Sequence, residues 1–337
     1  MNCRSAGLRA AGLSAVLLAT PLQAADPLSS TDAAVWLQRM SDAARHIAYE
    51  GVFVVQHGSA IQTLSIVNRP IGASKESRIA AMDGAQREVR CSQSGSVSRV
   101  MEGGQIKLEK RLNGRHFPDL LPLSAASLAN WYGVRLGELA RVAGQECRQV
   151  EILPKDAYRW GYVLCADKDS GLPLRATMVN EAGQPLMQYA FAEIRLGTAP
   201  KSEAQSRGDA WSMPALPVSV RPIGFEAVIA KNLPPGFSRI SAVKRTLPNK
   251  PGEVEHWVFS DGLTHISLFL ERAAHPVASV RGQSKQGMIN MVTRQVGTLQ
   301  ATVLGDAPWA AIEAIATGLE IRTDGRTEAG ETRGDPR

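Results

Sequence analysis

Short β-rich runs separated by turn residues fill most of this 337-residue chain after residue 48. The segment "YEGVFVVQHGSAIQTLSIVNRP" (49–70) has two such runs around a turn at 57–59. The segment "GLPLRATMVNEAGQPLMQYAFAEIRL" (171–196) has two more around a turn at 181–183. Runs of this kind joined by short turns predict β-hairpins. The chain is therefore expected to be mainly β, with a long antiparallel sheet.

One amphipathic helix is expected before the first hairpin. Ser30 and Thr31 are candidate caps for its first turn. Apolar side chains then recur at steps of three and four residues, which is the helical period: Trp36, Leu37, Met40, Ala44 and Ile47. A second, short helix is predicted in "SAASLANWYG" (124–133).

The first 24 residues predict export. Arg4 and Arg9 precede the apolar run "LSAVLLAT", and Pro21 and small residues follow it, which is the layout of a cleavable secretory signal. The mature chain is expected to begin near Ala25 or Asp26, so Cys3 would leave with the signal. No later stretch reaches the roughly 18 apolar residues that a membrane span needs. The predicted location is the periplasm.

Two cysteines lie in "CRQVEILPKDAYRWGYVLCADKDSG" (147–171). If the segment is a hairpin centred on Asp156, Cys147 faces Cys165 and Val150 faces Tyr162. Facing side chains are close enough for a disulfide after a modest adjustment, and an oxidising compartment would keep it closed. The spacing does not fit the paired C-x-x-C of zinc or thioredoxin-like sites. Cys91 is then left as a buried or weakly reactive thiol, and its pairing with either of the other two stays open.

Other candidate metal sites are weaker. "DKDSG" (167–171) has the acid spacing of a calcium loop, but Met178 stands where the final bidentate glutamate would fall, so we expect a turn between strands. His256 and His265 lie on opposite strands of a predicted hairpin and are expected to be separate side chains. No G-x-S-x-G, H-E-x-x-H or Gly-rich phosphate loop occurs. We predict no metal, no cofactor and no enzymatic activity.

Charge gives little indication of a nucleic-acid partner. Of the 38 basic residues two lie in the signal, which holds no acidic residue, so the mature chain has 36 basic against 32 acidic residues and a net charge of +4. No basic cluster is interleaved with aromatic residues. Nucleic-acid binding is therefore not expected.

Composition predicts two domains. We expect an N-terminal domain at 26–200, a linker at 201–221 rich in Pro, Ser and Ala, a smaller domain at 222–321 and a disordered tail at 322–337. In the smaller domain, "VEHWVFSDGLTHISLFLE" (254–271) predicts a hairpin whose two turn residues, Asp261 and Gly262, have positive φ.

A helix is predicted after the last strands of the smaller domain. Two strands broken at Gly297 come first, and Asp306 and Pro308 can begin the helix. Its buried stripe is expected to be Trp309, Ile312, Ala316 and Leu319. The domain should therefore be a small α+β unit, with the helix on one face of the sheet.

Several stretches in both halves resemble the sigma-E factor regulatory proteins called RseB or MucB. They are, in order, "YEGVFVVQHG", "MDGAQREV", "FPDLLP", "RVAG", "DSGLPL", "QYAFAEI", "LPPGF" and "FSDGLTHISLFLE", followed by the Gly-containing strand and capped helix. The resemblance implies a half-open antiparallel β-barrel like that of the lipoprotein carriers LolA and LolB, joined to a smaller α+β domain. Long stretches without a match, before "LPPGF" and around 91–101, prevent a transfer of individual contacts.

The resemblance also implies a function. Such proteins bind the periplasmic part of a membrane-anchored anti-sigma factor of the RseA/MucA kind, protect it from proteolysis, and release it in response to lipopolysaccharide or related lipid. "GVFVVQ" is apolar on both faces, so Val52, Phe53, Val54 and Val55 are the candidate lipid-groove residues. The alternative is a periplasmic lipid or lipoprotein carrier of the LolA/LolB type. The identity of the lipid, the residues that touch the partner, and whether the protein forms oligomers are left open by the sequence.

Overall fold

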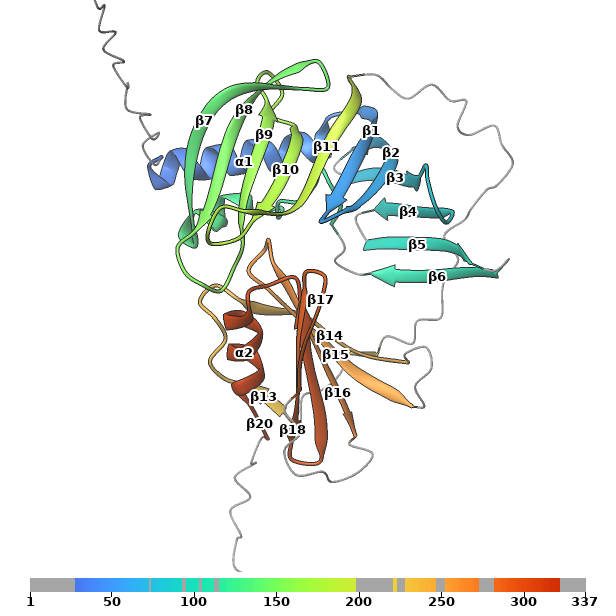
Figure 1. Ribbon diagram of the computed structural model, residues 1–337, viewed down its shortest axis with the longest axis vertical. Coiled ribbons are helices and arrows are strands. Elements are labelled where there is room, and N and C mark those ends of the chain that lie inside the picture. The colour runs from blue at the N-terminus through green and yellow to red at the C-terminus, as the bar shows by residue number, and fades with distance from the viewer. Residues whose placement is uncertain are drawn as a thin grey trace, which may run out of the picture.

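Two antiparallel sheets, each with its own core, make up the protein in a computed structural model (Figure 1). The structure describes residues 28–72, 74–92, 95–102, 105–111, 115–197, 221–222, 228–246, 252–272 and 282–321. Within these residues no helix is both long and apolar enough to span a membrane.

The first sheet has eleven strands among the described residues. From one edge to the other they are β6 (Gln105–Arg111), β5 (Gly95–Glu102), β4 (Arg87–Ser92), β3 (Ser74–Ala81), β2 (Ala60–Ile71), β1 (Tyr49–His57), β11 (Pro185–Leu196), β10 (Pro173–Val179), β9 (Gly161–Asp167), β8 (Gln145–Pro154) and β7 (Tyr132–Val142).

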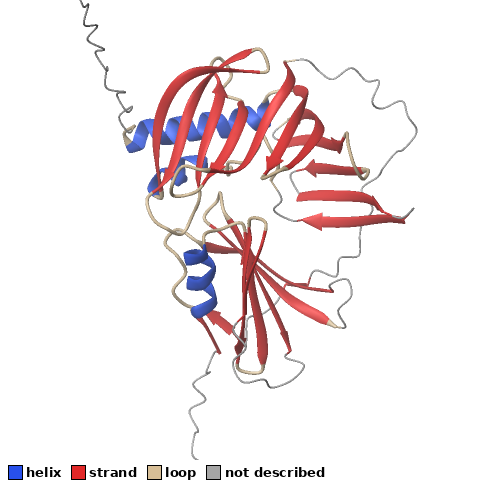
Figure 2. Cartoon of the chain, in the orientation of Figure 1, coloured by secondary structure: helices blue, strands red, loops and turns tan. Residues whose placement is uncertain are grey.

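This order is two meanders joined side by side. Strands β1 to β6 form one and β7 to β11 the other, and the first and last strands, β1 and β11, pair antiparallel between them. The edge strands β6 and β7 do not pair with each other, so the sheet stays open (Figure 2). The predicted half-open, mainly antiparallel fold is confirmed.

Helix α1 (Ser30–His46) lies across one face of this sheet (Figure 1). The predicted caps were one or two residues late, because the Ser29 side chain accepts the N–H of Asp32 and leaves Ser30 and Thr31 inside the helix. Leu37 and Met40 are fully buried on the core side. The second predicted helix is the 3-10 helix η1 (Ala125–Asn130), and it packs on the same side of the sheet as α1.

Close contact between β1 and β11 depends on Gly51. The two strands shift register between Val52 and Phe53, and a Cβ at Gly51 would lie 2.3 Å from the Glu193 carbonyl oxygen. Gly51→Ala should lower the free energy of unfolding by about 1–3 kcal/mol, because the backbone of β11 must move away. Urea unfolding of the purified mature protein measures the change.

Gly133 in β7 supplies the matched control. A Cβ there would lie 3.9 Å from the nearest atom, the Leu153 carbonyl oxygen, so Gly133→Ala should leave stability unchanged or slightly raised. Equal losses in the two variants would show that backbone crowding at Gly51 is not the cause.

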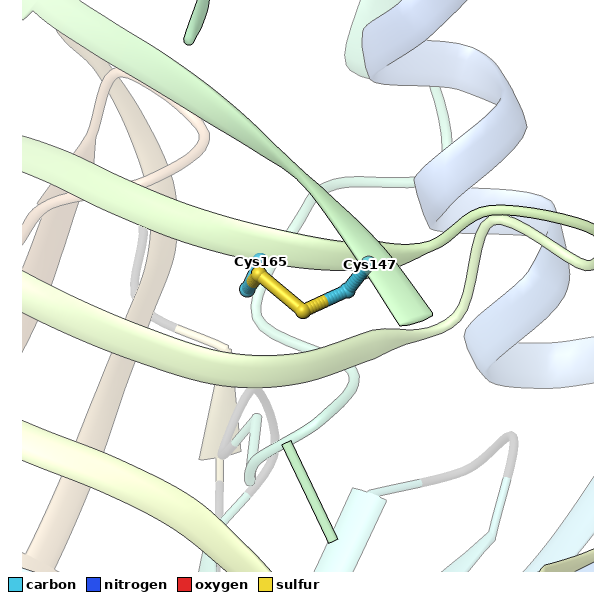
Figure 3. Close-up of a disulfide and its surroundings, with 2 residues drawn as sticks. All are labelled: Cys147 and Cys165. Atoms are coloured by element: carbon cyan, nitrogen blue, oxygen red, sulfur yellow. A yellow bond between two sulfur atoms is a disulfide. The ribbon is translucent and has the colours of Figure 1, made fainter. Parts of the chain in front are cut away.

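The cysteine hairpin has a different register from the one predicted. Strands β8 and β9 pair Val150 with Leu164 and Cys147 with Asp167, so Cys147 and Cys165 are diagonal neighbours rather than opposed. The loop 155–160 is longer than a turn centred on Asp156 allows, and this moves the register by two residues. A shift of two keeps every side chain on its face. The cysteines, with Cα atoms 5.4 Å apart, are joined by a disulfide (Figure 3).

The segment 167–171 is a turn between β9 and β10. The Asp167 carboxylate accepts hydrogen bonds from the backbone N–H of Ser170, at 2.8 Å, and from the Ser170 hydroxyl, at 2.6 Å. Its carboxylate therefore holds the turn that the sequence predicted.

The second sheet is smaller and has a short helix packed on it. Its strands, in spatial order, are β12 (Arg221–Pro222), β14 (Ser238–Thr246), β15 (Glu253–Ser260), β16 (His265–Arg272), β19 (Leu299–Gly305), β18 (Ile289–Val296) and β17 (Gly282–Gln286). A two-stranded sheet joins β13 (Val228–Ala230) to β20 (Leu319–Ile321). Helix α2 (Trp309–Thr317) buries Ala311, Ile312, Ile315 and Ala316. The smaller α+β domain is confirmed.

The start of α2 differs from the prediction. Pro308 occupies the N-cap position and no side chain caps the helix, so Asp306 lies outside it. Leu319, predicted in the helical stripe, is buried from β20 instead, because the helix ends at Thr317.

The predicted linker and tail fall mainly outside the described residues, which omit 198–220 and 322–337. The boundaries at 26–200, 201–221 and 222–321 therefore stay a prediction. Limited proteolysis of the mature protein should cut first between Thr198 and Pro222. Early cleavage inside β1 or β16 would contradict these boundaries.

Candidate functional site

A small cavity lies between strands β1 to β4 and the chain segment 115–120. Its volume is about 200 Å³. Most of its lining residues are apolar, and a few are polar. The lining residues are Phe53, Val55, Gln62, Leu64, Ile79, Ala81, Arg87, Val89, Arg115, His116, Phe117, Leu120 and Tyr189.

Aromatic rings form one wall of the cavity. The Phe117 ring stacks on Tyr189, with centroids 5.5 Å apart and an angle of 11° between the planes. It also lies 5.3 Å from the Phe53 ring and 5.1 Å from the Phe191 ring. Packed rings of this kind give a dry, rigid surface.

Only two of the four groove candidates line this cavity. Phe53 and Val55 are in its wall. Val52 and Val54 point to the opposite face, because neighbouring side chains of a strand alternate between faces. Val52 and Val54 are therefore not part of this cavity, and the assignment of the four residues to a lipid groove stays a prediction.

Basic groups also line the cavity. Arg87 is exposed, and Arg115 and His116 are partly buried. Burial lowers the pKa of the Arg115 guanidinium; the negative charge of Asp119 opposes this effect, and the positive charge of Arg45 adds to it. The cavity therefore combines an apolar wall with cationic groups, which suits an apolar chain attached to an anionic group.

An ion-pair network anchors the segment that carries Arg115 and Phe117. Asp119 forms a salt bridge of 2.7 Å with Arg45 of α1 and another with Lys75 of β3. Arg45 also donates to the Leu121 carbonyl at 2.5 Å, and Ser41 donates to the Pro122 carbonyl at 2.7 Å. These contacts hold one wall of the cavity against α1.

A polar side chain at Val55 should weaken binding of an apolar ligand. Val55→Asn places an amide in the apolar wall, where its desolvation costs about 1–3 kcal/mol, so affinity for a fluorescent acyl lipid should fall about tenfold or more. Val54→Asn, on the opposite face of the same strand, is the matched control and should bind normally. Equal losses in both variants would place the lipid elsewhere.

A buried arginine joins the two domains. The Arg159 side chain is fully buried, and its Nη1 donates to the Asp261 Oδ2 at 3.0 Å. Its Nε donates to Asp156 at 3.0 Å, and its Nη2 donates to the Pro235 carbonyl. The guanidinium also lies 5.2–5.6 Å from aromatic ring centroids, within the range of cation–π attraction: Trp131, Tyr132 and Phe237.

Asp261 receives contacts from both domains. The Tyr132 hydroxyl donates to its Oδ2 at 2.9 Å, while its Oδ1 accepts the backbone N–H groups of Leu263 and Thr264 at 2.9 and 2.7 Å. Burial, and then the charge of Asp261, raise the pKa of Tyr132 well above its usual value, so the phenol stays a donor. The Asp261 carboxylate is therefore fully paired.

The Asp261–Gly262 turn differs from the predicted two-residue turn. Ser260 pairs with His265, which leaves a loop of four residues, 261–264. Gly262 has φ +102°, but Asp261 is not among the described residues with positive φ. The hydrogen bonds of the Asp261 carboxylate shape the longer loop instead.

This loop, with its flanking residues 260 and 265, is the hairpin tip, and it packs into the first domain. Leu263 belongs to the first core although it comes from the second sheet. A Cβ at Gly262 would lie 3.2 Å from Pro122, so the backbone of the tip lies against the first domain. Met288, from the turn between β17 and β18, also packs on the first core.

His256 and His265 do not face each other. His256 pairs with Phe269 across the strands, and their rings stack with centroids 4.3 Å apart. Burial, and then the charge of Arg245, lower the pKa of His256 to about 4. His265 lies in the tip, where burial and the charge of Arg115 lower its pKa. Within the described residues, no group of three or more His, Cys, Asp or Glu side chains is placed to hold a metal ion.

Sequence reasoning missed Arg159, Tyr132 and Arg115. The Asp261–Gly262 turn was visible as a turn, but its partner lies about a hundred residues away in the chain. In a hairpin centred on Asp156, a charged residue such as Arg159 looks like an ordinary solvated side chain, so nothing in its neighbourhood signals burial.

Two domain families match this chain. Residues 32–209 match the MucB/RseB N-terminal domain, and residues 225–320 match the MucB/RseB C-terminal domain. Together the two matches cover both sheets.

Individual relatives give the same result. The chain is 30% identical to the sigma factor AlgU regulatory protein MucB of Pseudomonas aeruginosa over 317 residues, 92% of this chain and 97% of that protein. It is 26% identical to the sigma-E factor regulatory protein RseB of Escherichia coli K12, over 85% of this chain and 89% of that one. A crystal structure of MucB in complex with MucA(peri) matches 87% of this chain and all of that chain, with 26% identity and a TM-score of 0.69.

Proposed function

Because this chain belongs to the MucB/RseB family, we propose that it is a periplasmic negative regulator of the envelope-stress response. It binds the periplasmic part of a membrane-anchored anti-sigma factor and protects that protein from regulated proteolysis. Lipopolysaccharide or a related lipid releases it. The observation that carries the proposal is the likeness, across both domains, to a MucB that was crystallised with MucA(peri).

The cavity beside β1 is the proposed lipid site. Its aromatic wall, with Phe53 and Phe117, suits acyl carbons, which need dry surface and few directed bonds. Arg87 and Arg115 stand where an anionic group attached to the chain would meet them. The protein then acts by binding alone, without catalysis.

The joint between the domains supports a regulator over a lipid carrier. A carrier of the LolA/LolB type would need only the first sheet and its cavity. Here Leu263 and Met288 of the second domain pack on the first core, and Arg159 fixes the contact. The second domain is thus placed to respond to a change at the first.

A binding titration tests the proposal. The mature protein is titrated with a peptide covering the periplasmic part of its cognate anti-sigma factor, with and without lipopolysaccharide. We expect lipid to weaken peptide binding at least tenfold, which is a coupling of about 1.4 kcal/mol. By linkage, the peptide must then weaken lipid binding by the same factor.

Two results would contradict the proposal in different ways. Equal peptide affinity with and without lipid would remove the lipid-controlled release but leave protection of the anti-sigma factor. Absence of binding to any anti-sigma segment, together with delivery of bound lipid to an acceptor, would favour the carrier.

A further inference from the structure

Arg115 belongs to the cavity and to the joint between the domains at the same time. Its side chain lines the cavity beside Phe117. Its Nη1 donates a hydrogen bond of 2.9 Å to the carbonyl oxygen of Gly262, in the hairpin tip of the second domain. Arg115 therefore links the cavity wall to the second domain by a hydrogen bond.

The bond from Arg115 to Gly262 is one that an anion can displace. Its acceptor is a neutral carbonyl, whereas a phosphate or carboxylate offers a guanidinium a full negative charge and two parallel hydrogen bonds. Asp119 forms its salt bridges with Arg45 and Lys75, and its charge acts on Arg115 without a salt bridge between the two. Burial disfavours its charged form and lowers its pKa, so the guanidinium gains from a nearby negative charge.

Side chains of the first domain hold the hairpin tip in position. Gly262 follows Asp261, whose carboxylate accepts from Arg159 and Tyr132, and precedes Leu263, which is buried in the first core. If the Arg115 guanidinium moves away, the Gly262 carbonyl oxygen stays at the contact between the domains without this hydrogen bond. An incompletely paired group of this kind weakens the contact between the domains.

His265 lies at the other end of the same loop and feels the same charge. The positive charge of Arg115 lowers the pKa of His265, and the negative charge of Asp261 opposes this effect. Movement of the guanidinium from the tip toward the cavity therefore changes the electrostatic field of the tip as well as its hydrogen bonding.

We propose that Arg115 couples the two binding events: an anionic lipid group in the cavity draws the Arg115 guanidinium from the Gly262 carbonyl, and the freed hairpin tip lowers affinity for the anti-sigma segment. The inference rests on the proposed function, because it explains how lipid causes release. Arg115 is a positioning residue for the second domain, and the anion is the part of the lipid that it detects.

Arg115→Gln separates this coupling from binding. The glutamine amide can still donate to the Gly262 carbonyl, but it carries no charge for the anion to attract. Arg141→Gln is the matched control, because Arg141 also donates to a backbone carbonyl, that of Gly144, is exposed and does not line the cavity. Peptide affinity is measured for the mature wild type and both variants, each with and without a saturating concentration of dodecyl phosphate below its micelle concentration.

Two further probes distinguish the effect of the lipid's charged group from the effect of its apolar chain. Dodecyl glucoside carries the same chain without charge, and inorganic phosphate carries the anion without a chain. Far-UV circular dichroism and thermal unfolding confirm that each variant is folded, and a lipid titration fixes the saturating concentration for each protein.

We expect dodecyl phosphate to weaken peptide binding at least tenfold in the wild type and in Arg141→Gln, and less than threefold in Arg115→Gln. Dodecyl glucoside and inorganic phosphate should each change wild-type affinity less than threefold. Release by dodecyl glucoside as strong as release by dodecyl phosphate would overturn the inference, as would an undiminished response in Arg115→Gln. A wild type that responds to no lipid, lipopolysaccharide included, would instead overturn the lipid-controlled release in the proposed function.

Discussion

Replacing Arg159 with methionine should lower the free energy of unfolding by about 3–5 kcal/mol, because it leaves the Asp261 carboxylate buried without its charged partner. Both side chains of this pair are fully buried, and the pair crosses from the first domain to the second. Methionine keeps much of the packing against Trp131 and Tyr132, so the loss comes mainly from the unpaired charge. Reversible urea unfolding of the mature protein measures it.

The double variant Arg159→Met/Asp261→Asn identifies the cause. The asparagine Oδ1 can still accept the N–H groups of Leu263 and Thr264, while the buried charge is gone. The double variant should therefore be less destabilised than Arg159→Met alone, which gives a coupling between the two positions. Purely additive losses would show that the ion pair does not determine stability at the joint.

An exposed ion pair provides the comparison. Lys168 and Glu146 lie 3.1 Å apart with both side chains more than half exposed. Exposed pairs of this kind contribute little to stability, so Lys168→Met should unfold like the wild type. A loss at Lys168 as large as that at Arg159 would contradict the importance given to burial.

Opening the disulfide should lower the free energy of unfolding by about 3 kcal/mol. Cys147 and Cys165 are separated by 18 positions, and closing a loop of that size restricts the unfolded chain by about this amount in the chain-entropy model. Urea unfolding of the oxidised protein is compared with that of Cys147→Ala/Cys165→Ala. Because both cysteines are fully buried, the oxidised protein should also keep its disulfide when mild reductant is added under native conditions.

Cys91 is the control for this experiment. It is buried in β4 without a disulfide, and burial raises the pKa of its thiol to about 11, so it should react slowly with thiol reagents while the protein is folded. Peptide mapping without reductant should find Cys147 linked to Cys165 and Cys91 free. A link between Cys91 and either of the other two would contradict the structure, and equal stability of the oxidised protein and the double variant would contradict the expected stabilisation.

The sequence by itself determined the local elements, because hydrophobic period and turn chemistry act over a few residues. The hairpins at 49–71 and 173–196, helix α1 and the turn at 167–171 all lie where their patterns predicted. The Cys147–Cys165 hairpin shows the limit of such reasoning. The predicted face of the sheet for each side chain was right, because it depends on the two-residue period of a strand. The predicted register between β8 and β9 was wrong, because it depends on the length of the loop 155–160.

Only the tertiary structure decided which residues line the cavity and which residues form the joint between the domains. Phe53 and Val55 line the cavity while Val52 and Val54 do not, since that choice depends on where the distant segment 115–120 crosses the sheet. Arg159 and Asp261 are each ordinary charged turn residues in the sequence, and burial makes them a pair because two loops about a hundred residues apart meet. Contacts between such distant positions depend on how whole sheets pack, and a local sequence pattern contains no information about that packing.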